Sequence, residues 1–257
     1  MPWKQMNIVI AILLLGYRIW VFRKGGKSIS TALGLSFNLR ECVHLAGGTL
    51  ISVVAISSIF LFEWSNGNLQ VAHIGPATAL MHDFSTFIAV PLIEEFIFRC
   101  AMLGGLLVLV PASAAIPISA LIFGGLHAFN QNATVLSVVT TSIGGLAYGI
   151  AFLITERIGF PLGLHFGWNY FQARVFGFSI SGGFRGPAPW VLQHDRGPDL
   201  LTGGAYGPEG GLVGLAAKLL VLVLVTAWFV LERRLYRKNQ DGESAKMREG
   251  FAVINQP

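Results

Sequence analysis

The sequence predicts an all-α protein, a polytopic integral membrane helical bundle with seven or eight transmembrane helices. Its composition is 53% hydrophobic and only 12% charged, with a mean hydropathy of +0.63. Such a composition is typical of membrane proteins. Its apolar runs approach the ~20 residues that a helix needs to cross ~30 Å of hydrocarbon. The basic residues sit mainly at the ends of these runs, so the net charge of +5 indicates membrane topology and not a nucleic-acid partner.

The apolar runs cover roughly residues 6–22, 43–64, 75–92, 91–110, 112–130, 133–155, 161–177 and 211–231. The count depends on Pro91, where two runs meet. Proline fits the first turn of a helix, so we expect a new helix to begin there. No repeat of 20 to 50 residues is visible, and we therefore predict a single transmembrane helical domain over residues 1–231.

The segments outside these runs indicate which side of the membrane they occupy. The first run is followed by Arg23, Lys24 and Lys27 without a small-residue cleavage site, so we expect a retained helix and not a signal peptide. Residues 23–42 resemble an interfacial stretch on the cytoplasmic face. Residues 232–257 form a polar, basic tail that the positive-inside rule places in the cytoplasm. Residues 178–210 are rich in glycine and proline, and we expect a connector there in preference to a substrate-gating loop.

Three ionisable residues within one apolar run are the first candidates for a functional site. Ionisable groups inside the membrane are costly, and by default they indicate function. Glu95 and Arg99 are four positions apart, so they share a helical face and can form an ion pair. Glu94 points about 100° away on the same helix, which makes it the candidate general base. The alternative is that both acids belong to a packing network with Arg99.

Two later runs add polar side chains at helical spacing. Phe123 and His127 share one face, and a histidine there can orient water or carry a proton. His165 and Asn169 share another face and offer two N–H donors aimed one way, which suits a developing oxyanion. A helix-packing network is the alternative for both pairs.

The three motifs resemble those of one family of intramembrane endopeptidases, the CAAX protease and bacteriocin-processing family, also called the abortive-infection family. The resemblance spans roughly residues 91–171 and rests on Glu94-Glu95-x-x-x-Arg99, Phe123-x-x-x-His127 and His165-x-x-x-Asn169, in that order.

The resemblance implies a catalytic core at about residues 75–177. In this core Glu94 and His127 activate the attacking water, while His165 and Asn169 stabilise the tetrahedral intermediate. Glu95, Arg99 and Phe123 support the site. The resemblance also implies a multi-pass protein of a bacterial inner membrane with a peptide or protein substrate at the bilayer. It leaves open whether that substrate is prenylated, bacteriocin-like or otherwise membrane-associated, and it leaves the oligomeric state open.

The cofactor prediction is that none is obligatory. Glu94, His127 and His165 are the zinc ligands if a metal is used, but the chain has neither a His-Glu-x-x-His helix nor a cysteine cluster. Two alternatives from other classes remain: a membrane transporter that uses the same residues as an ion relay, and an immunity or scaffold protein that only binds a partner.

Simple alternation of the helices raises a difficulty for this site. It places Glu94 and His127 near one membrane face and His165 near the other. Convergence then requires a deep-set site, short or tilted helices, or a partly re-entrant stretch near Pro161.

Overall fold

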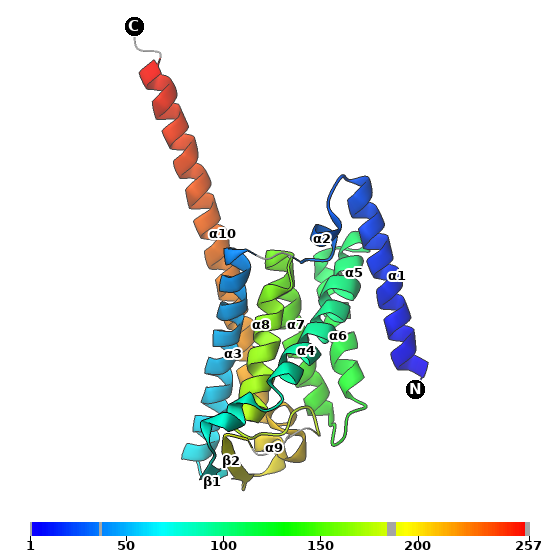
Figure 1. Ribbon diagram of the computed structural model, residues 1–257, viewed down its shortest axis with the longest axis vertical. Helices are drawn as coiled ribbons and strands as arrows, with labels where there is room; N and C mark the ends of the chain where they lie inside the picture. Colours follow the sequence, from blue (N-terminus) through cyan, green and yellow to red (C-terminus); the bar gives the residue numbers. More distant parts are fainter. Residues whose placement is uncertain (1, 36–37, 184–188, 255–257) are drawn as a thin grey trace.

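A bundle of long helices forms most of the computed structural model, which describes residues 2–35, 38–183 and 189–254 (Figure 1). The elements are α1 (Pro2–Lys24), α2 (Ile29–Ala32), α3 (Leu39–Ser65), β1 (Leu69–Ile74), η1 (Ala77–Met81), α4 (Phe84–Glu95), η2 (Phe96–Leu103), α5 (Gly104–Leu109), α6 (Ala112–His127), α7 (Val135–Thr155), α8 (Gly159–Tyr170), η3 (Phe171–Val175), β2 (Val191–Asp195), α9 (Asp199–Thr202), η4 (Gly204–Tyr206), η5 (Pro208–Gly210) and α10 (Leu212–Ile254). The η2 and η3 segments are π-helical, and the other η segments are 3₁₀ helices.

The helical membrane architecture is confirmed, but the number of spans is not. Within the described residues, three segments are long and apolar enough to cross a membrane: α3, α7 and the Leu212–Arg234 part of α10. A fourth helix, α6, is apolar but shorter. The predicted count of seven or eight transmembrane helices is therefore not established by these lengths.

The prediction that a helix begins at Pro91 is wrong. Pro91 lies inside α4, and α4, η2 and α5 follow one another without a break from Phe84 to Leu109. The helix begins earlier because Asp83 adopts a left-handed conformation (φ 53°), which ends the preceding turn, and its carbonyl accepts the first helical hydrogen bonds. The acids Glu94 and Glu95 consequently lie near the middle of one helical stretch.

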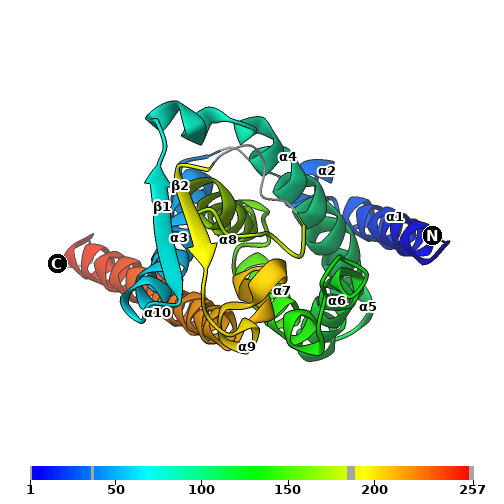
Figure 2. The ribbon, with the colours of Figure 1, turned by 90° about the horizontal axis from the view of Figure 1, so that it is seen from below.

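A small sheet was not expected from the sequence. Strands β1 and β2 pair antiparallel, with Leu69 opposite Asp195 and Ile74 opposite Val191. Together with α9 they lie at the lower end of the helices in Figure 1 and therefore in front of the helices in Figure 2, which is seen from below. The segment predicted as a connector thus contains β2 and three short helical turns, and its residues 184–188 lie outside the described part of the chain.

The two basic segments also take a defined backbone. Helix α10 continues across residue 231 and carries the predicted tail as far as Ile254, projecting beyond the bundle (Figure 1). The final residues, 255–257, lie outside the described part. The predicted interfacial stretch holds α2, while its residues 36–37 are also outside that part.

Close packing of α8 against α3 fixes the depth of the later site residues. A Cβ atom on Gly163 would overlap the backbone of Leu45, and one on Gly167 would lie 2.8 Å from the carbonyl oxygen of Thr49. Glycines let two helix backbones approach in this way. Ser52 adds a hydrogen bond, since its hydroxyl donates to the carbonyl of Leu164 at 2.6 Å. The backbone that carries His165 is therefore held firmly.

Candidate active site

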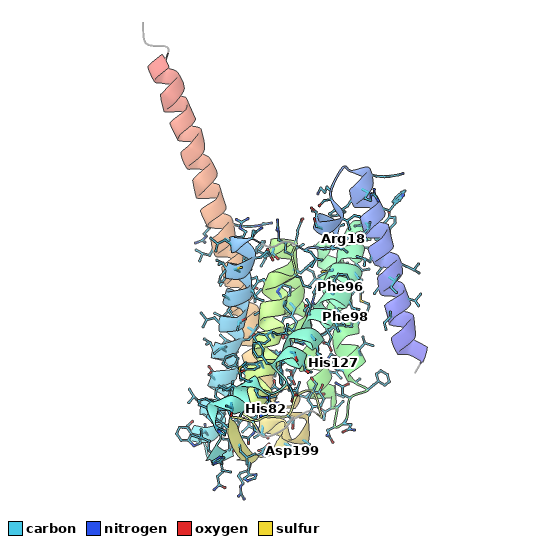
Figure 3. The ribbon with its side chains drawn as sticks, viewed as in Figure 1. Arg18, His82, Phe96, Phe98, His127 and Asp199 are labelled. Atoms are coloured by element: carbon cyan, nitrogen blue, oxygen red, sulfur yellow. The ribbon has the colours of Figure 1, made fainter. Side chains whose placement is uncertain are left out.

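The predicted site residues come from four helical elements, α4, η2, α6 and α8. Glu94 and Glu95 end α4, just before the π-helical η2, and His127 ends α6. His165 lies within α8, which is itself followed by the π-helical η3. Single π-turns inside helices occur often at functional sites because they redirect side chains. Figure 3 shows His127 nearer than Phe98 to the end of the bundle that carries His82 and Asp199.

The convergence of these helices has a simple geometric cause. Helix α8 has 12 residues, so it is only ~18 Å long and too short to cross the hydrocarbon alone. His165 lies near its middle, and Glu94 and Glu95 lie near the middle of the stretch from Phe84 to Leu109. A deep-set site and a short helix thus bring the acids and His165 to the same depth.

Glu95 is fully buried and has two partners. Its Oε2 accepts from Nε of Arg99 at 2.9 Å, so the predicted ion pair is present. Its Oε1 accepts from Nδ1 of His165 at 2.8 Å. Both oxygens are therefore engaged, as a buried carboxylate requires.

Arg99 is also fully buried and extends this network to α6. Its guanidinium lies 3.4 Å from the hydroxyl of Ser119, which in turn donates to the carbonyl of Phe98 at 3.2 Å. The same guanidinium lies 5.0 Å from the ring centre of Phe123, within cation–π range. Phe123 thus contacts the site through the face of its ring, over which the guanidinium of Arg99 lies.

Two aromatic rings and one hydrogen bond hold the ring of His165. It stacks on Tyr148 with centroids 5.3 Å apart and meets Phe123 edge-on at 6.1 Å. Because Nδ1 donates to Glu95, the other nitrogen, Nε2, points towards Glu94 and lies 3.8 Å from its Oε2. A neutral His165 has thus already used its one N–H, and Nε2 can donate to an oxyanion only when the ring carries a second proton.

His127 is oriented differently. Its Nδ1 lies 2.8 Å from the carbonyl oxygen of Phe123. A carbonyl only accepts hydrogen bonds, so Nδ1 carries a proton, and in the neutral ring Nε2 then presents a lone pair. The ring also packs at 4.8 Å on that of Phe123. His127 is therefore an acceptor of hydrogen bonds at its free nitrogen.

Glu94 and His127 line one cavity of about 250 Å³. The Glu94 side chain is 32% exposed, whereas that of Glu95 is fully buried. The two adjacent acids thus have different surroundings, as their positions on the helix predict. The remaining lining residues are Asn130 and the apolar Ile8, Ile97, Phe98 and Leu126.

Asn169 lies apart from these two residues. It lines a separate cavity of about 230 Å³ with Ile180 and four residues of α4, one of which is Pro91. Pro91 is three positions before Glu94, and Asn169 is four positions after His165, so this second cavity is displaced by one helical turn. The expectation that His165 and Asn169 point one way into a shared hollow stays a prediction, because His165 lines neither of these two cavities.

The metal-ligand set considered from the sequence does not assemble. Among the residues that the structure describes, no three His, Cys, Asp or Glu side chains are arranged to hold a metal ion. The three side chains named as zinc ligands therefore form no such group.

Sequence reasoning missed a buried polar chain behind His165. The hydroxyl of Tyr148 lies 3.3 Å from Nζ of Lys218, and this ammonium lies 3.2 Å from the ring centre of Trp168. The indole N–H of Trp168 donates to Glu209 at 2.8 Å. A signal existed, because Lys218 is the only charged residue in the apolar run 211–231.

The fold and the site define a class, a helical membrane protein with a buried carboxylate–imidazole centre. A comparison with protein families refines this class. Residues 76–171 match the family described as Rce1-like, type II CAAX prenyl endopeptidase Rce1-like. This match confirms the resemblance predicted from the three motifs. Searches of curated proteins and of solved structures found no match.

Proposed function

We propose that this chain is an intramembrane endopeptidase of the CAAX type, in which Glu94 and His127 activate a water molecule. The observation that carries the proposal is that both side chains line one cavity. In addition, Oε2 of Glu94 lies 3.8 Å from Nε2 of His165. The family match supports peptide hydrolysis at a membrane.

The two side chains suit a water nucleophile because both present acceptors. A water between them donates one hydrogen to the Glu94 carboxylate and the other to Nε2 of His127. Its oxygen lone pair then faces the substrate. As the oxygen attacks the peptide carbonyl, a proton passes to Glu94, and it moves on to the leaving amine when the C–N bond breaks.

The groups that stabilise the oxyanion would come from α8. Nε2 of His165 faces Glu94 and can donate when the ring is an imidazolium, and Asn169 offers amide N–H groups one turn away. Glu95 and Arg99 would hold His165 in place through the 2.8 and 2.9 Å contacts. No step in this scheme uses a metal.

The cavity walls indicate the kind of substrate. Ile8, Ile97, Phe98 and Leu126 make most of the lining apolar. A peptide segment that is membrane-associated, prenylated or bacteriocin-like would find apolar contacts beside the reacting groups. We place the enzyme in a bacterial inner membrane with its basic α10 end in the cytoplasm.

The test compares membrane-peptide profiles from cells that carry the wild type or the Glu94→Gln variant. New termini should appear only with the wild type. Glu156→Gln, an exposed glutamate in the α7–α8 turn, is the matched control and should give the wild-type profile. Identical profiles from wild type and Glu94→Gln would refute the proposal, and they would favour the transporter or scaffold alternatives.

A further inference from the structure

One end of the helical bundle concentrates the basic residues. These are Arg23 and Lys24 at the end of α1, Lys27 just after it, Arg40 at the start of α3, Arg157 in the α7–α8 turn, and Arg233 and Arg234 on α10. We call this the basic end. In Figure 1 it is the upper end of the bundle, where α10 emerges.

Contacts show that these segments meet at one place. Arg40 lies 3.8 Å from Glu232 of α10, and Arg157 lies 3.7 Å from Glu41 of α3. The stretch after α2 joins them, since the amide of Ile158 donates to the carbonyl of Gly34 at 3.1 Å. These contacts join α3, α10 and the α7–α8 turn, and the last turn of α1 lies at the same end of the bundle (Figure 1).

The opposite end carries few basic residues. Within the described residues it holds Lys4, Arg174 and Arg196, and Arg174 is buried with an ion pair to Asp83 at 3.2 Å. The sheet and α9 lie there, with Asp195 and Asp199. Short loops rich in lysine and arginine stay in the cytoplasm, which makes the basic end the cytoplasmic one.

The active-site cavity leads towards the opposite end. His127 is the last residue of α6, and the turn after it is tied to the sheet end by a hydrogen bond from Asn132 to the carbonyl of Gly182 at 3.1 Å. Asn130 lines the active-site cavity and also a second hollow of about 390 Å³, which includes the exposed Phe129 and Gln131. Figure 3 agrees, since Arg18 marks the basic end and His127 lies well away from it.

We infer that the site is reached from the non-cytoplasmic side, so that its substrate is a peptide segment exposed on that side of the membrane. The term substrate here rests on the proposed function. The physical reason is that the polar backbone of a peptide needs a polar route to Glu94, and the polar route through Asn130 ends away from the basic residues.

Cysteine labelling in spheroplasts tests the orientation without any need for activity. In a Cys42→Ser background, which removes the exposed native cysteine, Asp199→Cys should react with a membrane-impermeant maleimide. Lys27→Cys should react only after the membrane is opened. If Asp199→Cys is poorly produced, Leu200→Cys on the same short helix replaces it, with a side chain on a residue that is 65% exposed. Labelling of Lys27→Cys alone in sealed spheroplasts would overturn the inference.

The termini found by comparing wild type with Glu94→Gln provide the second arm. They should map to non-cytoplasmic segments of membrane-associated proteins or to exported peptides. Termini confined to cytoplasmic segments would overturn the inference while leaving the proposed protease intact. If no such termini exist, the proposed function fails, and the labelling still decides the orientation.

Discussion

The Nδ1 atom of His165 lies 2.8 Å from Oε1 of Glu95, although 70 positions separate the two residues. Arg99 holds the other oxygen of the same carboxylate at 2.9 Å. This carboxylate therefore fixes which nitrogen of His165 faces Glu94. The two adjacent acids therefore have different positions: Glu95 is buried and orients the ring of His165, whereas Glu94 lines the cavity.

Replacing Glu94 with glutamine should lower peptide turnover by about 10²- to 10⁴-fold, the usual contribution of a general base. The amide keeps the shape of the side chain but cannot take a proton from water. Turnover in detergent by purified protein measures the effect, with unfolding curves to show that the fold persists. Glu156→Gln is the control and should turn over normally; a fully active Glu94→Gln protein contradicts the assignment.

His127→Ala should cost about as much as Glu94→Gln, and the double variant should be little worse than either one. Two groups that act on the same water fail together, so their effects are not additive. The two side chains share one cavity, which is the basis of this expectation. Measured rates for the two single variants and the double variant decide it. Losses that multiply in the double variant would mean that the residues act independently.

Arg99→Met should lower the free energy of unfolding by about 3–5 kcal/mol because it leaves Glu95 buried without its cationic partner. The double variant Glu95→Gln/Arg99→Met should recover much of this loss, since no net charge then remains in the pair. Denaturant unfolding in detergent measures both. If the double variant lost as much unfolding free energy as the two single variants Glu95→Gln and Arg99→Met together, the ion pair would not be the cause.

Metal removal should leave proteolysis intact. The described residues hold no arrangement of three metal-ligating side chains. Protein stripped with a strong chelator is assayed with and without added zinc. Loss of activity that zinc restores would show that the ligands rearrange around a metal, as in other hydrolases.

The sequence predicted the helical membrane class and the Glu95–Arg99 pair because both depend on local rules. Composition reports burial in lipid, and a spacing of four reports a shared helical face. The family match over residues 76–171 agrees with the resemblance found over 91–171.

Other features depend on contacts between distant segments and were not predictable in this way. Helix α4 begins after Asp83, whose carboxylate lies 3.2 Å from Arg174, 91 positions further along the chain. The pairing of β1 with β2 joins residues more than 100 positions apart. The same holds for the bond between Glu95 and His165, since helical spacing gives a face but not the neighbour that the face meets.

Asn169→Ala should reduce kcat by about 100-fold if this amide binds the oxyanion, as loss of one such donor commonly does. Its place in a separate cavity, one turn from His165, makes a second outcome informative. An amide that only binds the peptide chain would raise KM and leave kcat unchanged, because uniform binding does not affect the chemical step. The control is Thr86→Ala, on the same cavity wall, which should alter KM alone if it alters anything. A fall in kcat confined to Asn169→Ala would mean that the substrate carbonyl lies between the two cavities. Its carbon would then face Glu94 while its oxygen reaches the amide of Asn169, beside Pro91.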